Sequence, residues 1–203
     1  MLYIRTRLQN GILWLMLDRP PLNILSLEML DQLSTAVREA LALEPRLVVL
    51  MGVGERAFSA GVDVSEYLDG REKEMLRAIS ENYAAFAALR AHGIATTALV
   101  KGVALGGGCE LAGLCDTVLA HEHATFGLPE IGLGVFPPLA SACFPRLLGH
   151  QSTQRLMLTG ETISAREALR LGFVHQVLSA RRFLADAEEL LVMLAATSQA
   201  GVK

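Results

Sequence analysis

The chain has 203 residues, of which 52% are hydrophobic and 5% aromatic, and its formal net charge is −3. This length allows one domain with a sizeable core, and the composition predicts a core of Leu, Val and Ala. The weak charge balance argues against nucleic acid as the main partner. Because no apolar run reaches a membrane-spanning length and the N-terminus lacks an apolar signal core, we expect a cytoplasmic protein without a membrane partner.

Hydrophobic periodicity predicts alternating strands and helices from the N-terminus onward. We expect a strand over residues 11–17, then an amphipathic helix over residues 25–43 with Ser26 as its N-cap. Pro45 ends this helix before a buried strand at residues 47–51. The segment that follows, residues 56–64, is predicted to be a loop that leaves this strand.

The second half of the chain continues the alternation. A long helix is expected over residues 72–90, followed by one strand over residues 96–103 that leads into a glycine turn. After the turn, the predicted elements are a helix through residues 111–114, strands at 117–120 and 124–126, and helical segments at 151–158, 165–171 and 181–196. Repeated strand–strand–helix units indicate an α/β spiral, with a core over residues 1–180 and a short C-terminal helical segment over residues 181–203.

The glycine turn is the most informative motif. Gly106, Gly107 and Gly108 come directly before a predicted helix start, and Glu110 falls in its first turn. Backbone N–H groups at such a turn bind developing negative charge, although a tight turn with close packing explains the glycines equally well. A dinucleotide-binding loop is less favoured, since Leu111 stands where its third glycine belongs.

A second acid, Glu130, follows twenty positions after Glu110. If the intervening segment folds back, the two carboxylates converge beside the glycine turn. That arrangement is a candidate acid/base site. The cysteines and the His121-Glu122-His123 run have no zinc-ligand spacing, so we expect no metal site.

Three segments together resemble the crotonase superfamily, the enoyl-CoA hydratases and isomerases. They are Phe58-Ser59-Ala60-Gly61-Val62-Asp63, Gly106-Gly107-Gly108-Cys109-Glu110-Leu111-Ala112 and Phe126-Gly127-Leu128-Pro129-Glu130. The resemblance covers residues 2 to 177 and implies the crotonase-like α/β spiral. It also implies an acyl-CoA substrate, with coenzyme A as part of that substrate and no prosthetic group.

The resemblance implies roles for individual residues. The backbone N–H groups of Ala60 and Gly107 would form an oxyanion hole for the thioester oxygen, and Glu110 and Glu130 match the two hydratase glutamates that hold one water. Retaining both acids favours hydration over isomerisation. The remaining predicted substrate-binding residues are Ser59, Gly61, Val62, Asp63, Gly106 and Phe136, although Asp63 is expected to order its loop rather than react.

Two departures from the family pattern stand out. Val135-Phe136-Pro137-Pro138 replaces a glycine-rich segment and is similar to the variant of cyclohexadienecarbonyl-CoA hydratases, with ordinary wall variation as the alternative. The C-terminal helical region is also short, although the resemblance implies a homo-oligomer, a trimer or hexamer. A non-catalytic acyl-CoA-binding subunit and a serine hydrolase that uses Ser59 are the other hypotheses; the second lacks a G-x-S-x-G motif.

Overall fold

A computed structural model describes residues 1–196, and for residues 67 and 68 it describes the backbone only. Its strands are β1 (Ile4–Gln9), β2 (Ile12–Leu17), β3 (Leu47–Gly52), β4 (Ala57–Ser59), β5 (Ala95–Val100), β6 (Val103–Leu105), β7 (Thr117–His121), β8 (Thr125–Gly127), β9 (Thr162–Ser164) and β10 (Gln176–Leu178). Its helices are α1 (Leu27–Leu43), α2 (Val64–Glu66), a π-helical turn η1 (Tyr67–Arg71), α3 (Glu72–Ala91), α4 (Gly107–Leu114), a 3-10 helix η2 (Pro129–Leu133), α5 (Pro138–Leu148), α6 (His150–Thr159), α7 (Ala165–Arg170) and α8 (Phe183–Ala195).

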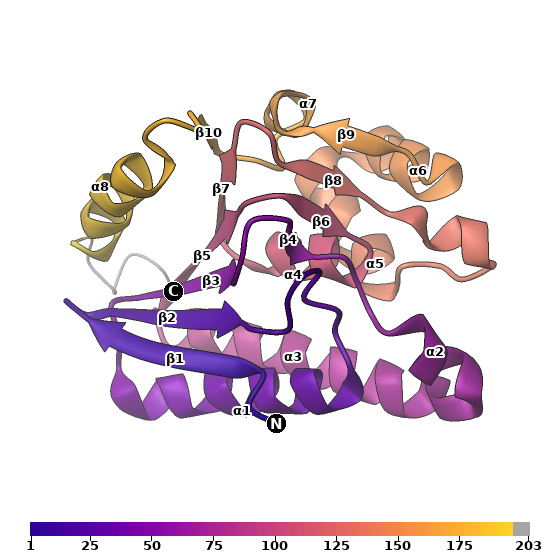
Figure 1. The fold of residues 1–203 in the computed structure, drawn as a ribbon, viewed down its shortest axis with the longest axis horizontal. Helices are drawn as coiled ribbons and strands as arrows, with labels where there is room; N and C mark the ends of the chain where they lie inside the picture. Colours follow the sequence, from indigo (N-terminus) through magenta and orange to yellow (C-terminus); the bar gives the residue numbers. More distant parts are fainter. Residues whose placement is uncertain (197–203) are drawn as a thin grey trace.

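The strands form two sheets. The larger sheet has the order β1-β2-β3-β5-β7-β10 and is parallel except for the β1–β2 pair. The smaller sheet has the order β4-β6-β8-β9. Helices α1 and α3 lie side by side against one face of the larger sheet, and α8 lies against its other face (Figure 1).

Successive pairs of strands alternate between the two sheets, so the chain forms a spiral. The pairs β3–β4, β5–β6 and β7–β8 each place their first strand in the larger sheet and their second in the smaller one. Helical segments follow each pair, so the predicted strand–strand–helix unit is confirmed. This arrangement brings the ends of β4, β6 and β8, and the loops that follow them, to one region of the molecule.

Two predictions of local structure were wrong, and one helix was not predicted. The strand expected at residues 96–103 is two strands, because the chain turns at Gly102 (φ +69°), where a Cβ would lie 2.2 Å from the Arg56 carbonyl oxygen. The loop expected at residues 56–64 begins with β4, which pairs with β6. Helix α5 was missed because Pro145 lies inside it and opposes a helical interpretation, although the prolines at its start are compatible with a helix N-terminus.

Other elements agree closely with the prediction. Ser26 caps α1 by accepting a hydrogen bond from the Met29 N–H, and Ser164 caps α7 through the Glu167 N–H. Strand β1 was not predicted, because every residue after Ile4 is exposed and no apolar alternation marks it. The predicted C-terminal helix is α8, and residues 197–203 of that segment lie outside the described residues.

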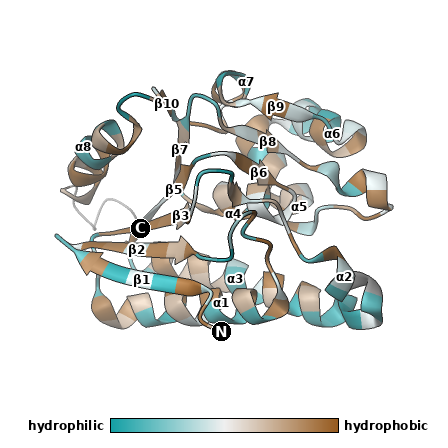
Figure 2. Cartoon of the chain, viewed as in Figure 1, coloured by the Kyte–Doolittle hydropathy of each residue, from teal (hydrophilic) through white to brown (hydrophobic). Residues whose placement is uncertain are grey.

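Hydrophobic residues predominate along most strands (Figure 2), and their buried side chains pack into two clusters. The main core lies between the sheets and helices α1 and α3, and a second cluster, which includes Phe183 and Leu191, joins α8 to the outer face of the larger sheet. Cys109 and Cys115 are buried in the main core and Cys143 is half-buried. In the described part of the chain, no helix is both long and apolar enough to cross a lipid bilayer.

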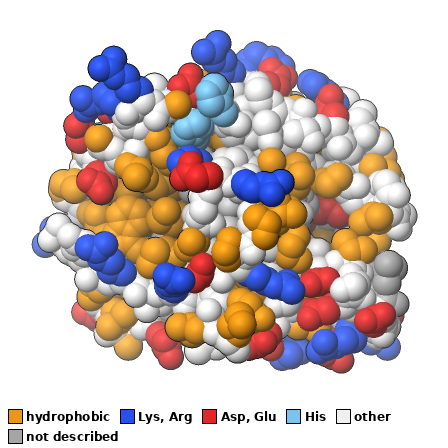
Figure 3. Space-filling view, in the orientation of Figure 1, with side chains coloured by type: hydrophobic (Ala, Val, Ile, Leu, Met, Phe, Trp, Pro, Cys, Tyr) orange, Lys and Arg blue, Asp and Glu red, His pale blue; other side chains and the backbone are white. Residues whose placement is uncertain are grey.

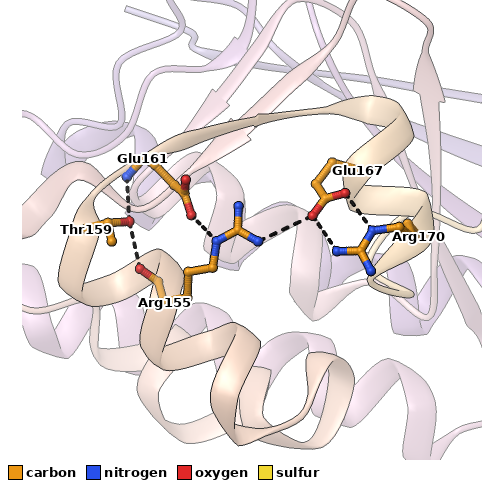
Figure 4. A network of polar contacts seen from close by, with 5 residues as sticks. All are labelled: Arg155, Thr159, Glu161, Glu167 and Arg170. Atoms are coloured by element: carbon orange, nitrogen blue, oxygen red, sulfur yellow. Dashed lines mark hydrogen bonds and ion pairs between the residues drawn. The ribbon is translucent and has the colours of Figure 1, made fainter.

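A polar network on the surface joins α6 to α7 (Figure 4). The Arg155 guanidinium lies between two carboxylates, 2.5 Å from Glu161 Oε1 and 3.4 Å from Glu167 Oε1. Glu167 also pairs with Arg170 at 2.7 Å, and this pairing is the main reason that the pKa of Glu167 falls to about 2. Exposed ion pairs of this kind add little stability, so the network contributes little to the free energy of unfolding.

Candidate active site

An apolar cavity of about 150 Å³ lies where the loops after β4, β6 and β8 meet. Its inner wall consists of residues 60–62 and the start of α4, with Gly106, Gly107 and Glu110. Its outer wall consists of residues from 129 to 138, including Glu130 and Phe136. The two glutamates that the sequence places twenty residues apart therefore face one cavity.

Asn23 holds the loop that carries the inner wall. It is fully buried, and its Nδ2 group donates to the carbonyl oxygens of Val53 and Ala57 at 3.1 and 2.9 Å. Its Oδ1 accepts from the Arg19 N–H at 3.0 Å. A single buried amide thus ties the 19–23 segment to both ends of the turn between β3 and β4, which fixes where β4 and the following loop begin.

The glycine turn is required by geometry at two positions. Gly106 has φ +51°, and a Cβ there would lie 2.8 Å from Glu130 Oε1. At Gly108 a Cβ would lie 2.3 Å from the Ser59 carbonyl oxygen, closer than atoms can approach. The glycines therefore allow α4 to begin directly against the 59–63 loop and leave room for the Glu130 carboxylate.

The backbone nitrogens of Val62 and Gly107 both lie at this contact. A Cβ on Gly107 would lie 3.5 Å from the Val62 nitrogen, and one on Gly61 would lie 3.6 Å from the Gly107 nitrogen. Among the described residues, neither the Val62 N–H nor the Gly107 N–H has an acceptor. The first turn of a helix leaves its N–H groups unpaired, so Gly107 is a donor at the positive end of α4.

The expected role of Ala60 is contradicted by the structure. The Ala60 N–H donates to the Leu22 carbonyl oxygen at 2.9 Å, so it is already used within the protein. Two residues further along the same loop, the Val62 N–H has no such acceptor among the described residues. The sequence pointed to the correct loop, but only the hydrogen-bond pattern distinguishes which N–H group is available.

Glu110 is almost fully buried, with 2% exposure, and lies in the first turn of α4. Its Oε1 accepts a hydrogen bond of 2.8 Å from the Ala140 N–H. Ala140 lies in the first turn of α5, where N–H groups have no partner within the helix. Burial raises the pKa of Glu110 to about 7, against the opposing effect of the Ala140 N–H, and the charge of Glu130 adds to the rise. The carboxyl group is therefore poised between its two protonation states near neutral pH.

Glu130 lies in η2 on the outer wall and is half-buried. Its Oε2 is buried without a hydrogen-bond partner among the described residues. Burial raises the pKa of this carboxyl group as well. Two acids with raised pKa values on opposite walls of one apolar cavity form a pair that can hold and transfer a proton.

Two predicted substrate-binding residues do not line the cavity. Ser59 is fully buried, and its Oγ accepts from the Gly61 N–H at 3.2 Å, which also argues against a nucleophilic serine. Asp63 accepts from Ser65 Oγ at 2.6 Å and pairs with Arg19 at 3.1 Å. The Ser65 hydrogen bond is the largest cause of the lowered pKa of Asp63, so this carboxylate stays ionised and orders its loop.

The remaining predicted residues, Gly61, Val62, Gly106 and Phe136, do line the cavity. The apolar residues that complete the wall were not predicted from the sequence. They are Val64, Met75, Leu76, Ile79, Pro129, Leu133, Val135 and Pro138. The three α3 residues Met75, Leu76 and Ile79 follow a three- to four-residue spacing, and this signal indicates a helix face without saying what it faces.

Comparison with known proteins places this geometry in a family. The family model described as enoyl-CoA hydratase/isomerase matches residues 7–203. The chain belongs to the enoyl-CoA hydratase/isomerase family. The resemblance predicted from the three motifs is thereby confirmed, and so is the fold.

Individual members of the family are similar over most of this chain. YngF of Bacillus subtilis, named as an enoyl-CoA hydratase/isomerase, is 36% identical over 190 residues, which are 92% of this chain and 73% of that protein. The crotonyl-CoA hydratase of Syntrophomonas wolfei is 34% identical over 172 residues, 83% of this chain and 65% of that protein. The solved structure of the Bacillus anthracis enoyl-CoA hydratase superposes with a TM-score of 0.89 at 30% identity, covering 99% of this chain and 80% of that one.

Proposed function

We propose that the protein adds water to an α,β-unsaturated acyl-CoA thioester, or removes it in the reverse direction. The observation that carries this proposal is the convergence of Glu110 and Glu130 on one cavity beside the unpaired N–H groups of Val62 and Gly107. The names of its relatives, among them a crotonyl-CoA hydratase, support the same reaction class. Coenzyme A enters as part of the substrate.

The chemistry follows from these groups. The thioester oxygen accepts hydrogen bonds from the Val62 and Gly107 N–H groups, and these bonds strengthen as the enolate forms. One carboxylate removes a proton from a water held between the two acids, so that the hydroxyl group bonds to the β-carbon. The α-carbon then receives a proton from the second acid. The pair starts and ends with one shared proton, so atoms and charges balance.

A ring-shaped acyl group is the second candidate substrate. The cavity is apolar and measures about 150 Å³, and a cavity of roughly this size and character holds one benzene molecule. The cavity therefore has room for a short acyl group or for a ring of about six carbons. Isomerisation of the double bond needs only one of the two acids, and the presence of both favours hydration.

The proposal is tested by following loss of the enoyl thioester absorbance with crotonyl-CoA and with cyclohexa-1,5-diene-1-carbonyl-CoA. A double variant, Glu110→Gln with Glu130→Gln, purified in parallel, controls for contaminating hydratases. We expect turnover of at least one substrate by the wild type and none by the double variant. Tight binding of both thioesters without turnover would contradict the proposal and support a non-catalytic acyl-CoA-binding role.

We also propose that the protein forms a homo-oligomer, a trimer or hexamer. Apolar side chains gather on the surface between α8 and β2 (Figure 3). Separately, helix α8 carries three exposed apolar side chains, Leu184, Val192 and Met193, which are 57–59% exposed. A cluster of exposed apolar side chains favours association with a second surface. Multi-angle light scattering is expected to show a trimer or hexamer, and a stable monomer at micromolar concentration would contradict this expectation.

A further inference from the structure

A second, much smaller cavity lies behind the inner wall of the active-site cavity. It measures about 10 Å³, at the lower limit of the roughly 10–15 Å³ that one water molecule requires. Val62, Ile79, Gly107 and Glu110 line both cavities. Apart from Glu110, the only polar side chain among its described lining residues is that of Asn82 on α3.

The orientation of the Asn82 amide is fixed by its neighbours. Asn82 is 1% exposed, and Nδ2 donates to the carbonyl oxygens of Leu30 and Ala78, each at 2.9 Å. A flipped amide would place its oxygen against these two carbonyl oxygens, so the assignment is unambiguous. Both hydrogens of the amide are therefore used.

The other end of the amide lacks a partner. Asn82 Oδ1 is buried, and no described residue donates a hydrogen bond to it. An unpaired buried acceptor is costly, and native proteins usually satisfy such a group with protein or with ordered water. Glu110 lines the same cavity; its Oε1 accepts from the Ala140 N–H at 2.8 Å, and a hydrogen bond from the Leu139 backbone also acts on the carboxyl group.

We propose that this cavity is a site for one structural water, which donates to Asn82 Oδ1 and contacts the Glu110 carboxyl group. The size of the cavity, the unpaired acceptor and the neighbouring carboxyl group together define the site. A water with one hydrogen directed to Asn82 keeps its other hydrogen and its lone pairs for Glu110, so it can serve either protonation state of the carboxyl group. Asn82 is thus a positioning residue for Glu110 and does not itself touch the substrate.

This inference has a structural test and a kinetic one, and the kinetic one rests on the proposed hydratase function. A high-resolution crystal structure of the wild type is expected to show density for one water between Asn82 Oδ1 and Glu110. In Asn82→Leu, which has the same branched shape but bulkier methyl groups and no acceptor, that density should be lost. The carbonyl groups of Leu30 and Ala78 lie within helices and keep their helical hydrogen bonds in this variant.

In the kinetic test, Asn82→Leu should lower kcat by roughly 10–100-fold, because Glu110 is no longer held in place, while KM changes little. Thr153→Val is the matched control. Thr153 is also fully buried, and its hydroxyl donates to the Gly149 carbonyl oxygen at 2.9 Å, but it lies in α6 and lines neither cavity. Its variant should be less stable and keep the wild-type kcat.

A second pair of variants covers the case in which Asn82→Leu does not fold. Asn82→Ser retains an oxygen that can accept from the water, whereas Asn82→Ala differs from it by that oxygen alone. We expect Asn82→Ser to keep the water and to have the higher kcat. The inference would be overturned if the crystal structure of the wild type showed no density for the water. It would also be overturned if Asn82→Leu or Asn82→Ala had the kcat of the wild type. An inactive wild type that shows the water would instead contradict the hydratase proposal.

Discussion

The inner wall of the active-site cavity is held by buried hydrogen bonds and backbone contacts, whereas the outer wall is a short 3-10 helix and loop that face solvent. On the inner wall, Asn23 and Gly108 fix the loop against α4, and Glu110 is bonded to Ala140. On the outer wall, Leu133 and Phe136 are 58% and 63% exposed. The comparison indicates that the inner wall holds the N–H groups and Glu110 rigidly, whereas the outer wall carries Glu130 together with exposed side chains that can differ without disturbing the inner wall.

Variants of the two carboxyl groups, one on each wall, are expected to have the largest effect on turnover. Glu110→Gln and Glu130→Gln should each lower turnover by roughly 10²–10⁴-fold, because each removes a group that takes up or releases a proton. Steady-state kinetics with the better substrate measures the effect, with circular dichroism to check folding. If either variant turns over like the wild type, that residue takes no part in the reaction, and the two walls do not share the chemistry.

Adding a Cβ to one glycine on each wall tests which of the two walls is rigid. Gly108→Ala places a Cβ 2.3 Å from the Ser59 carbonyl oxygen, and the displaced loop should lower kcat by roughly 100-fold. Gly132→Ala on the outer wall is the matched control, because its Cβ would meet no atom within 4 Å. We expect near wild-type kcat in this control. Equal losses in the two variants would show that the outer wall is as tightly constrained as the inner one.

Stability should depend on pH differently for the two acids. The folded protein holds the Glu110 proton up to a pKa of about 7, above the ordinary value of 4.5, so the stability that this group contributes is lost as pH rises between these values. Glu110→Gln removes that loss and should be more stable than the wild type at pH 8, by up to about 3 kcal/mol. Urea unfolding at pH 5 and pH 8 measures the difference.

Glu130→Gln should show a smaller gain in the same direction, because Glu130 is only half-buried and burial raises its pKa too. Comparing the gains in stability of the two variants at pH 8 would show which wall removes more water from its carboxyl group. A pH-independent difference between Glu110→Gln and the wild type would show that Glu110 is ionised throughout this range.

The smallest effect is expected at Phe136. Because this side chain is 63% exposed, Phe136→Ala should change the free energy of unfolding by no more than about 0.5 kcal/mol. It should instead alter the ratio of kcat/KM values between the cyclic and the straight-chain thioester, since Phe136 lines the cavity. An unchanged ratio would remove this residue from substrate selection.

The sequence by itself determined the family, the spiral and the main parts of the inner wall. The motifs around Gly61, Gly107 and Glu130 carry specific chemistry, and regular apolar spacing predicted α1 and α3 with small errors at their ends. These features are local, because capping, glycine conformations and helical periodicity depend on residues that are close in the chain.

Only the tertiary structure decided which groups are available and what they touch. The N–H groups of Ala60 and Val62 are indistinguishable in the sequence, and it is the Leu22 carbonyl, nearly forty residues earlier, that occupies the first and leaves the second unpaired. Glu110 likewise accepts its hydrogen bond from Ala140 in α5, a helix that was not predicted because Pro145 lies inside it. Hydrogen bonding and burial between distant segments are set by how the spiral closes, and no local pattern encodes them.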